Sequence, residues 1–206
     1  MTIHFHGSPI WGDAHAPTDM LIKALYRDGG AFVSFARPAQ MKKIAMFPCD
    51  IRLDNGAFSD WMKALKKGTP VDWSKRRAKF YDFVGKWFSR IEWFLIPDVI
   101  EGTEAENDKQ IELVPDWLKS KAVPVWHTDE SIDRLLRLSG KFEWVAIGCC
   151  GPHRHIRSKW WEQRMDEVFT ELYINRNLKV KIHGLRMLDV RVLGMYPFCL
   201  LYTSDA

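Results

Sequence analysis

The stretch Ile51-Arg52-Leu53-Asp54-Asn55-Gly56-Ala57-Phe58 decides how the rest of the chain is interpreted. Residues 51–53 favour a β-strand, and they bring the carboxylate of Asp54 directly into a turn. Gly56 lacks a Cβ atom, so the backbone there can bend tightly or let a ligand approach closely. An acid at the end of a strand beside such a turn is typical of an α/β active site. The alternative is that residues 54–56 form only a strand-ending turn, since Asp, Asn and Gly are common in turns.

The same pattern, a short apolar segment followed by a polar residue, recurs along the chain. We expect seven β segments, at residues 2–6, 31–35, 51–54, 93–96, 122–126, 143–147 and 179–182. Short continuous apolar runs are typical of parallel strands that are covered on both faces. No glycine-rich dinucleotide motif or phosphate-loop lysine motif is present, which argues against an open nucleotide-binding sheet. The sequence therefore predicts an α/β fold of the (β/α)8 TIM-barrel type that is incomplete, with the eighth strand missing.

Helices are expected between these strands, at residues 17–27, 39–45, 72–90, 103–118, 130–138 and 158–174. Thr103 and Glu106 match the pattern of a capping box. We expect Trp160 and Trp161 to pack a helix on the sheet rather than to stack on bases. The basic residues of the third helix are expected on a solvated face rather than against phosphates; they are Lys75, Arg76, Arg77, Lys79 and Lys86.

Composition sets broad limits on the class of protein. Hydrophobic residues make up 47% of the 206 residues and ten are Trp, which is enough for a packed core. The formal net charge of +4 permits a polyanionic partner without requiring one. The four cysteines form no Cys-x-x-Cys pair, so we interpret them as reduced thiols and expect no zinc cluster. The chain has no long apolar stretch and no signal-peptide pattern, and we therefore expect no membrane association and a cytoplasmic location.

Polar residues fall at the carboxyl ends of the expected strands. They are Ser8, Arg37, Asp54, Asp98, His127, Gly148 and His183. In a barrel these ends share one rim, and that rim carries the active site. The set therefore predicts a site for a small molecule, against the alternative that each residue only terminates its strand.

Five strings of the chain resemble one family of enzymes. They are Leu53-Asp54-Asn55-Gly56-Ala57-Phe58, Ile96-Pro97-Asp98-Val99-Ile100, Pro124-Val125-Trp126-His127, Val145-Ala146-Ile147-Gly148 and His183-Gly184-Leu185-Arg186-Met187-Leu188. Together they resemble the phage and bacterial branch of the queuine tRNA-ribosyltransferase (tRNA-guanine transglycosylase) superfamily, which includes the DNA 7-deazaguanine-inserting enzymes. The family fold is a TIM barrel. The resemblance implies a pentosyltransferase that exchanges guanine in tRNA or DNA for a 7-deazaguanine base.

The resemblance also implies roles for single residues. Asp54 would act as a general acid and base on the departing and arriving bases. Asp98 would accept hydrogen bonds from the amino and ring N–H groups of the base, as a carboxylate can. His127 stands where other members carry a Gln that reads the base. Gly148 and the His183-Gly184 pair would contact the base, as would the neighbours of Asp54 in the first string, Asn55, Gly56 and Phe58.

A basic loop after the sixth expected strand could contact the polynucleotide. Arg154 and Arg157 are placed best for this role. His153 and His155 lie beside them, and we interpret these two as part of the basic loop rather than as metal ligands.

The family's nucleophilic Asp follows the string seen here as Tyr196-Pro197-Phe198. Residues 199–206 do not match that part of the family and resemble a translated sequencing adapter. We therefore expect a single truncated domain at residues 1–198, a non-native tail at 199–206, and a chain that is unstable and inactive in base exchange. No cofactor is expected within these residues, and a zinc site would belong to a segment beyond them.

Two other functions fit parts of the pattern. Asp54, Asp98, His127 and His183 could be the ligands of a metal-dependent barrel hydrolase. His4 and His6 come near the His-x-His pair that such enzymes carry after the first strand. The chain could also be a non-catalytic nucleic-acid-binding subunit.

Overall fold

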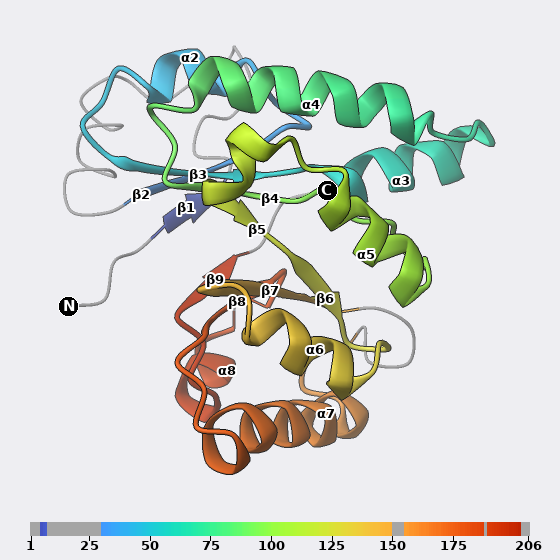
Figure 1. The fold of residues 1–206 in the computed structure, drawn as a ribbon, viewed down its shortest axis with the longest axis vertical. Coiled ribbons are helices and arrows are strands. Elements are labelled where there is room, and N and C mark those ends of the chain that lie inside the picture. Colours follow the sequence, from blue (N-terminus) through green and yellow to red (C-terminus); the bar gives the residue numbers. More distant parts are fainter. Residues whose placement is uncertain (1–4, 8–29, 150–154, 188, 203–206) are drawn as a thin grey trace. The chain divides into compact units, whose positions relative to one another are not determined.

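Parallel strands alternate with helices throughout the structure, which is a computed structural model. It describes residues 5–7, 30–149, 155–187 and 189–202 (Figure 1). The expected helix at 17–27, Ser8, His153 and Arg154 lie outside these ranges. The prediction of an α/β protein with parallel sheets is confirmed.

The chain divides into two compact units whose segments interleave along the sequence. The described residues up to Pro97, together with Val114–Ala122, belong to the first unit. The second unit holds Asp98–Leu113 and the described residues from Val123 onward.

The first sheet has five strands in the order β1-β2-β3-β4-β5. They are β1 (Phe5–Gly7), β2 (Gly30–Ser34), β3 (Asp50–Asp54), β4 (Trp93–Leu95) and β5 (Ala122–Val123). The helices among the described residues of this unit are α2 (Gln40–Ile44), α3 (Ala57–Lys67), α4 (Trp73–Trp87) and the short 3₁₀ helix Asp116–Lys121. The helix α4 runs along the sheet in Figure 1. The centre of its Phe80 ring lies 5.9 Å from the centre of the Phe94 ring in β4.

The alternation of side chains along β3 places Asp54 on the face of the sheet that α4 does not cover. Leu53 is in register with Phe94, which contacts α4. Arg52 is in register with Trp93, and its guanidinium lies 5.1 Å from the centre of that indole ring. Because successive side chains of a strand point to opposite faces, Arg52 and Asp54 share the face opposite α4.

The second sheet has four strands in the order β6-β7-β8-β9. They are β6 (Val125–His127), β7 (Trp144–Gly148), β8 (Lys181–Leu185) and β9 (Leu200–Tyr202). The helices of this unit are α5 (Glu104–Glu112), α6 (Ile132–Ser139), α7 (Lys159–Phe169), the π-helical turn Thr170–Asn175 and α8 (Val190–Met195).

One face of this second sheet forms a hydrophobic core with α6 and α7. The strands contribute Trp126, Val145, Ile147 and Ile182, and the two helices contribute Leu135, Leu138, Trp161, Met165 and Val168. By the same alternation, His127, Gly148 and His183 share the opposite face of the sheet. The sequence pattern thus separates an apolar, helix-covered face from a face that carries polar residues.

Two prolines explain where the observed elements depart from the expected ones. The strand expected at 122–126 is interrupted at Pro124, so β5 and β6 belong to different sheets. Proline has no N–H to donate, so Pro124 takes part in the sheet only through its carbonyl, which accepts a hydrogen bond from the amide of Ala146 at 2.9 Å. The helix expected at 103–118 ends at Glu112, because Pro115 disfavours helical backbone at the residue before it. Thr103 and Glu106 form the predicted capping box at its start.

Within the part of the chain that the structure describes, the sequence analysis missed three elements. The helix α3 begins at Ala57, directly after the turn of residues 54–56, and α8 follows Asp189. The strand β9 pairs in parallel with β8, so the expectation of a missing last strand is wrong. The amide of Cys199 donates to the carbonyl of Ile182 at 2.9 Å, which joins this segment to the polar edge that β8 would otherwise expose.

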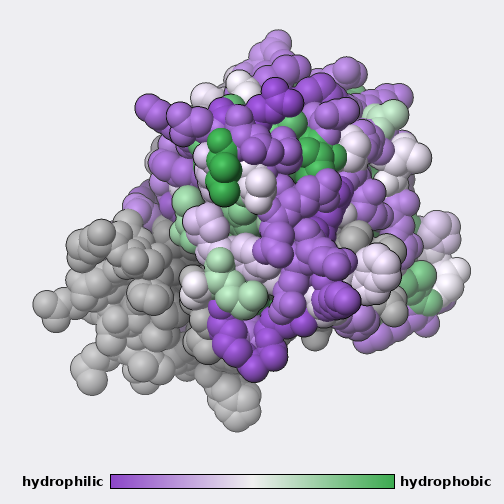
Figure 2. Space-filling model, turned by 90° about the horizontal axis from the view of Figure 1, so that it is seen from below, coloured by the Kyte–Doolittle hydropathy of each residue, from purple (hydrophilic) through white to green (hydrophobic). Residues whose placement is uncertain are grey.

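Hydrophobic residues on the surface are scattered rather than gathered in one large patch on the face shown in Figure 2, where the described residues are mainly hydrophilic. Large apolar side chains such as Met46, Leu65, Trp160 and Ile174 are exposed on different elements. Single exposed apolar residues of this kind are normal for a folded protein. Among the described helices, none combines the length and hydrophobicity needed to cross a membrane.

Gly56 gives the first test of this fold. Its φ is +69°, and a Cβ atom there would lie 2.7 Å from the backbone nitrogen of Ala36. Gly68 has a similar φ of +62°, but a Cβ atom there would meet nothing within 4 Å. We expect Gly56→Ala to lower the free energy of unfolding by about 1 to 3 kcal/mol more than Gly68→Ala, because only the first adds a steric clash to the backbone strain. Urea unfolding of both variants measures the difference, and equal losses would contradict the packing described here.

Candidate functional site

Asp54 ends β3 as a half-buried acid. Its Oδ1 accepts a hydrogen bond from the amide of Gly56 at 3.2 Å, which forms the turn into α3. The neighbouring Asn55 is buried, and both ends of its amide are used: Oδ1 accepts from Ala57 N–H at 2.7 Å and Nδ2 donates to the carbonyl of Ile96 at 2.8 Å. The amide of Asn55 therefore holds the turn in place, while the Asp54 carboxylate stays partly accessible.

Arg76 reinforces this turn from α4. Its Nε donates to the Asp60 carboxylate at 2.5 Å, and its Nη2 donates to the carbonyl of Asn55. Arg76 is only 8% exposed, so the expectation that it lies on a solvated helix face is wrong. The reason is a partner the sequence pattern does not reveal, namely the first turn of α3. Phe58 in that turn packs on Trp61, with 5.6 Å between the ring centres.

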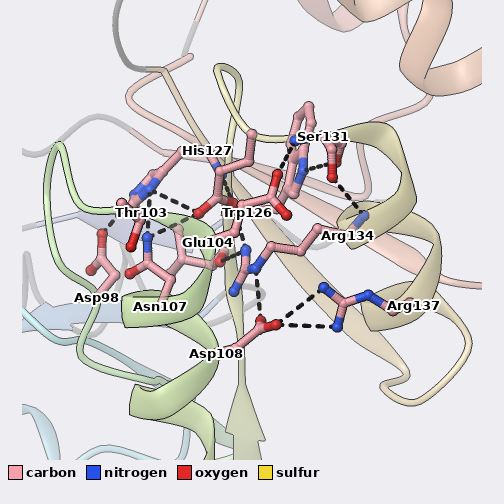
Figure 3. Close-up of polar contacts among 12 residues, drawn as sticks. Asp98, Thr103, Glu104, Asn107, Asp108, Trp126, His127, Ser131, Arg134 and Arg137 are labelled. Carbon is pink, nitrogen blue, oxygen red and sulfur yellow. Dashed lines mark hydrogen bonds and ion pairs between the residues drawn. The ribbon is translucent and has the colours of Figure 1, made fainter.

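The second unit contains a buried carboxylate–imidazole pair. Nε2 of His127, at the end of β6, lies 2.8 Å from Oδ2 of Asp98 (Figure 3). The two side chains are 3% and 8% exposed. Burial acts to lower the pKa of His127, but the hydrogen bond and charge of Asp98, with the charges of Glu130 and Asp129, outweigh it and raise the pKa above its ordinary value.

A second layer of polar groups holds His127 in place. The backbone N–H of His127 donates to Oε2 of Glu130 at 2.9 Å. Asn107, from α5, donates through Nδ2 to Oε1 of Glu130 at 2.9 Å and lies 3.4 Å from Nδ1 of His127. Glu130 and Asn107 are 5% and 2% exposed, so these bonds form away from water and fix the imidazole ring on its second side.

The charge of Glu130 is balanced by an ion-pair network that runs outward to the surface. Arg134 donates to Glu130 Oε2 at 2.5 Å and to Asp108 Oδ1 at 2.8 Å. Asp108 also accepts two hydrogen bonds from Arg137, both at 3.1 Å (Figure 3). Burial acts to raise the pKa of Asp108, but the bonds from Arg134 and Arg137 lower it overall. A buried carboxylate such as Glu130 is tolerated because a cation and several donors compensate its lost hydration.

Arg164, from α7, fixes the loop between β6 and α6. Its Nε donates to the carbonyl of Thr128 at 2.9 Å, and its Nη2 donates to that of Glu130. Its guanidinium also lies 5.1 Å from the centre of the Trp126 ring. Thr128 in turn donates its N–H to the carbonyl of Gly148 at 3.0 Å. The loop that carries Glu130 is therefore attached to both the helix layer and the sheet.

Gly148 provides the space that His127 occupies. The two residues are in register on β7 and β6. A Cβ atom on Gly148 would lie 2.9 Å from Cδ2 of His127, closer than real Cβ contacts come. His183, which is fully buried, is in register with Ala146 on the same face of the sheet, and Gly184 follows it on the opposite face.

The residues expected to contact a polynucleotide are only partly described. Arg157 is half-exposed and forms an ion pair with Asp189 at 3.4 Å. Arg154 lies outside the described residues. Trp161 is buried in the core as expected, whereas Trp160 is 66% exposed on α7, which the expectation of a packed side chain did not anticipate.

No group of three or more His, Cys, Asp or Glu side chains within the described ranges is arranged to hold a metal ion. The metal-dependent hydrolase considered above thus gains no support from this part of the chain.

The sequence analysis identified Asp98 and His127 but missed the residues that frame them. Asn107, Asp108 and Arg164 lie on helices, where polar residues are usually solvated. The spacing of Glu130 and Arg134, four residues apart, was a signal of an ion pair on a helix. Nothing in that spacing indicated that the pair is buried beneath His127.

The fold and this site define an α/β protein with parallel sheets and a buried carboxylate–imidazole pair at a strand end. Comparison with models of known protein families gave no match. Comparison with curated proteins gave no significant similarity.

We expect Gly148→Ala to disturb the His127 ring directly. The new methyl group would lie only 2.9 Å from Cδ2 of His127, so the free energy of unfolding should fall by about 1 to 3 kcal/mol and the imidazole should move. Gly140→Ala is the matched control, because a Cβ atom there would meet its nearest neighbour at 3.5 Å. Chemical unfolding and the NMR signals of His127 measure both effects, and an undisturbed His127 in Gly148→Ala would contradict the packing.

The raised pKa of His127 predicts how stability depends on pH. The unfolded chain loses the imidazole proton near pH 6.5, roughly, while the folded chain keeps it to higher pH. The contribution of His127 to stability is therefore fully present below the unfolded pKa and is lost as pH rises through the folded pKa. Above pH ~6.5 we expect the free energy of unfolding to fall more steeply in the unsubstituted chain than in His127→Gln. The extra loss should be about 1.4 kcal/mol for each unit by which the pKa of His127 in the folded chain exceeds its pKa in the unfolded chain. Urea unfolding of both chains across this pH range measures the difference. The same dependence of the free energy of unfolding on pH in both chains would refute the raised pKa of His127.

Proposed function

We propose that this chain is a base-exchange transglycosylase-like protein, of the kind that replaces guanine in tRNA or DNA with a 7-deazaguanine, and that its fold is of the (β/α) barrel type. We propose further that these 206 residues by themselves are inactive in the exchange. The observation that carries the proposal is the buried hydrogen bond between His127 and Asp98 at 2.8 Å. It holds a carboxylate in a nearly dry place at the end of a parallel strand, where α/β proteins bind their substrates.

Asp98 has the chemistry needed to recognise a guanine-like ring. Guanine and 7-deazaguanine both present a ring N–H and an amino N–H side by side, and one carboxylate can accept both. Adenine offers an acceptor in place of that ring N–H, so it would place a lone pair against the carboxylate. Nε2 of His127 lies 2.8 Å from Oδ2 of Asp98, within hydrogen-bond distance, and this contact orients the carboxylate.

For Asp54 we propose the proton-transfer role that the family resemblance implies. Its carboxylate is half-buried and lies on the face of the first sheet that α4 does not cover. A carboxyl group that is neither fully buried nor fully solvated can exchange protons with a departing base nitrogen. The target nucleotide must be single-stranded or flipped out of a helix for this chemistry. The described residues assign no nucleophile, so the proposal rests on base recognition.

Binding of the free base tests the proposal without requiring turnover. We expect the 206-residue chain to bind 7-deazaguanine in isothermal titration calorimetry and to bind adenine far more weakly. Asp98→Asn should weaken 7-deazaguanine binding by about 10- to 100-fold, since the lost interactions are hydrogen bonds to a charged group. Asp116→Asn is the matched control, because the Asp116 side chain is 94% exposed and pairs only locally, with Lys119.

Three binding results would overturn the proposal. Failure to bind 7-deazaguanine, equal affinity for adenine, or unchanged affinity in Asp98→Asn would each refute it. Asp54→Asn is expected to leave the binding of the free base within about threefold. Exchange of labelled guanine into tRNA or phage DNA by the 206-residue chain would contradict the expectation that this chain is inactive in base exchange.

A further inference from the structure

The orientation of the Asn107 amide is fixed by two buried contacts. Its Oδ1 accepts a hydrogen bond from the backbone N–H of Val99 at 2.8 Å. Its Nδ2 donates to Oε1 of Glu130 at 2.9 Å. The opposite orientation would set the amide oxygen against the Glu130 carboxylate and the amide hydrogens against the Val99 N–H. Both contacts would be repulsive in a place where water cannot screen them, since Asn107 is 2% exposed.

This orientation determines which group faces His127. Nδ2 of Asn107 is the atom that lies 3.4 Å from Nδ1 of the imidazole. An amide nitrogen is a donor only, so it interacts favourably with a ring nitrogen that carries a lone pair. On the other side of the ring, Nε2 lies 2.8 Å from the Asp98 carboxylate, which is an acceptor.

We infer that Asn107 is a positioning residue that keeps the proton of neutral His127 on Nε2. In this tautomer, Nδ1 faces the Asn107 donor with its lone pair, and Nε2–H donates to Asp98. In the other tautomer, a proton on Nδ1 would face the amide hydrogens, and the bare Nε2 would face the carboxylate. Oε1 of Glu130 lies 3.7 Å from Nδ1, too far to accept a hydrogen bond from that proton, so it does not replace the lost contact with Asp98.

Glu130 and Arg134 extend this arrangement. Glu130 accepts from the amide of Asn107 and from the backbone N–H of His127, so it fixes both partners at once. Arg134 forms an ion pair with Glu130 through a contact of 2.5 Å. A continuous series of polar contacts therefore ends on Asp98, the carboxylate proposed to bind the base. It runs from Arg134 through Glu130, Asn107 and His127.

The consequence is that Asp98 keeps a hydrogen-bond donor whether His127 is charged or neutral. Deprotonation removes the hydrogen from Nδ1 and leaves Nε2–H in place. The tautomer itself does not depend on the proposed function, but the effect on base binding rests on it. The two can therefore be tested separately.

NMR of the protein labelled with ¹⁵N-histidine reads the tautomer directly. The chain has seven His residues, and His127→Gln identifies the signals of His127. At a pH above the titration of this ring, we expect the natural chain to show Nε2 protonated and Nδ1 bare. The natural chain alone decides the assignment, since a protonated Nδ1 would overturn it.

Asn107→Asp tests whether Asn107 causes this state. The substitution places a carboxylate oxygen opposite Nδ1, so we expect Nδ1 to become protonated at the same pH. Asn175→Asp is the matched control, because Asn175 also donates to a glutamate, Glu171, but is exposed on another element. An unchanged His127 spectrum in Asn107→Asp would refute the role of Asn107.

Titration with 7-deazaguanine separates this inference from the proposed function. If the tautomer is as expected and the base does not bind, the proposed function fails and the role of Asn107 stands. If the base binds through Asp98 and neutral His127 carries its proton on Nδ1, the proposed function stands and this inference fails.

Discussion

The hydrogen bond between His127 and Asp98 imposes the main physical constraint on the second unit. Both side chains are withdrawn from water, and a buried carboxylate or imidazolium is tolerated only where other polar groups replace its hydration. The structure provides these groups in layers. Asn107 and Glu130 contact the imidazole or its backbone, Arg134 compensates Glu130, and the network reaches the surface at Asp108. A pair of this kind is costly unless every partner is in place, which is why so many buried polar residues converge there.

The backbone architecture makes that pair possible. Because side chains alternate along a strand, Trp126 enters the hydrophobic core while His127 emerges on the other face of the sheet. Gly148 on the neighbouring strand leaves the room that the imidazole fills. In the first unit the same alternation separates Leu53 from Asp54. In both units, therefore, a polar group ends a strand whose preceding residue packs beneath the helices.

Sequence reasoning predicted the elements with strong local signals and missed those that depend on distant partners. The capping box at Thr103 and the strand ending in Asp54 were predicted correctly, because both are specified by adjacent residues. The helix α3 was missed since its start depends on Arg76, which binds Asp60 and the carbonyl of Asn55 from another helix. The strand β9 was missed because its partner is the open edge of β8 rather than any feature of its own sequence.

The sequence by itself determined an α/β chain of parallel strands, and it placed Asp54, Asp98 and His127 at strand ends, because residue periodicity and turn chemistry are local properties. Only the tertiary structure decided that Asp98 and His127 bond to each other, that Arg76 and Arg134 are buried, and that Asn107 faces the imidazole. Those outcomes depend on which segments meet in space and on how far each side chain is removed from water. Neither quantity can be obtained from the spacing of residues along the chain.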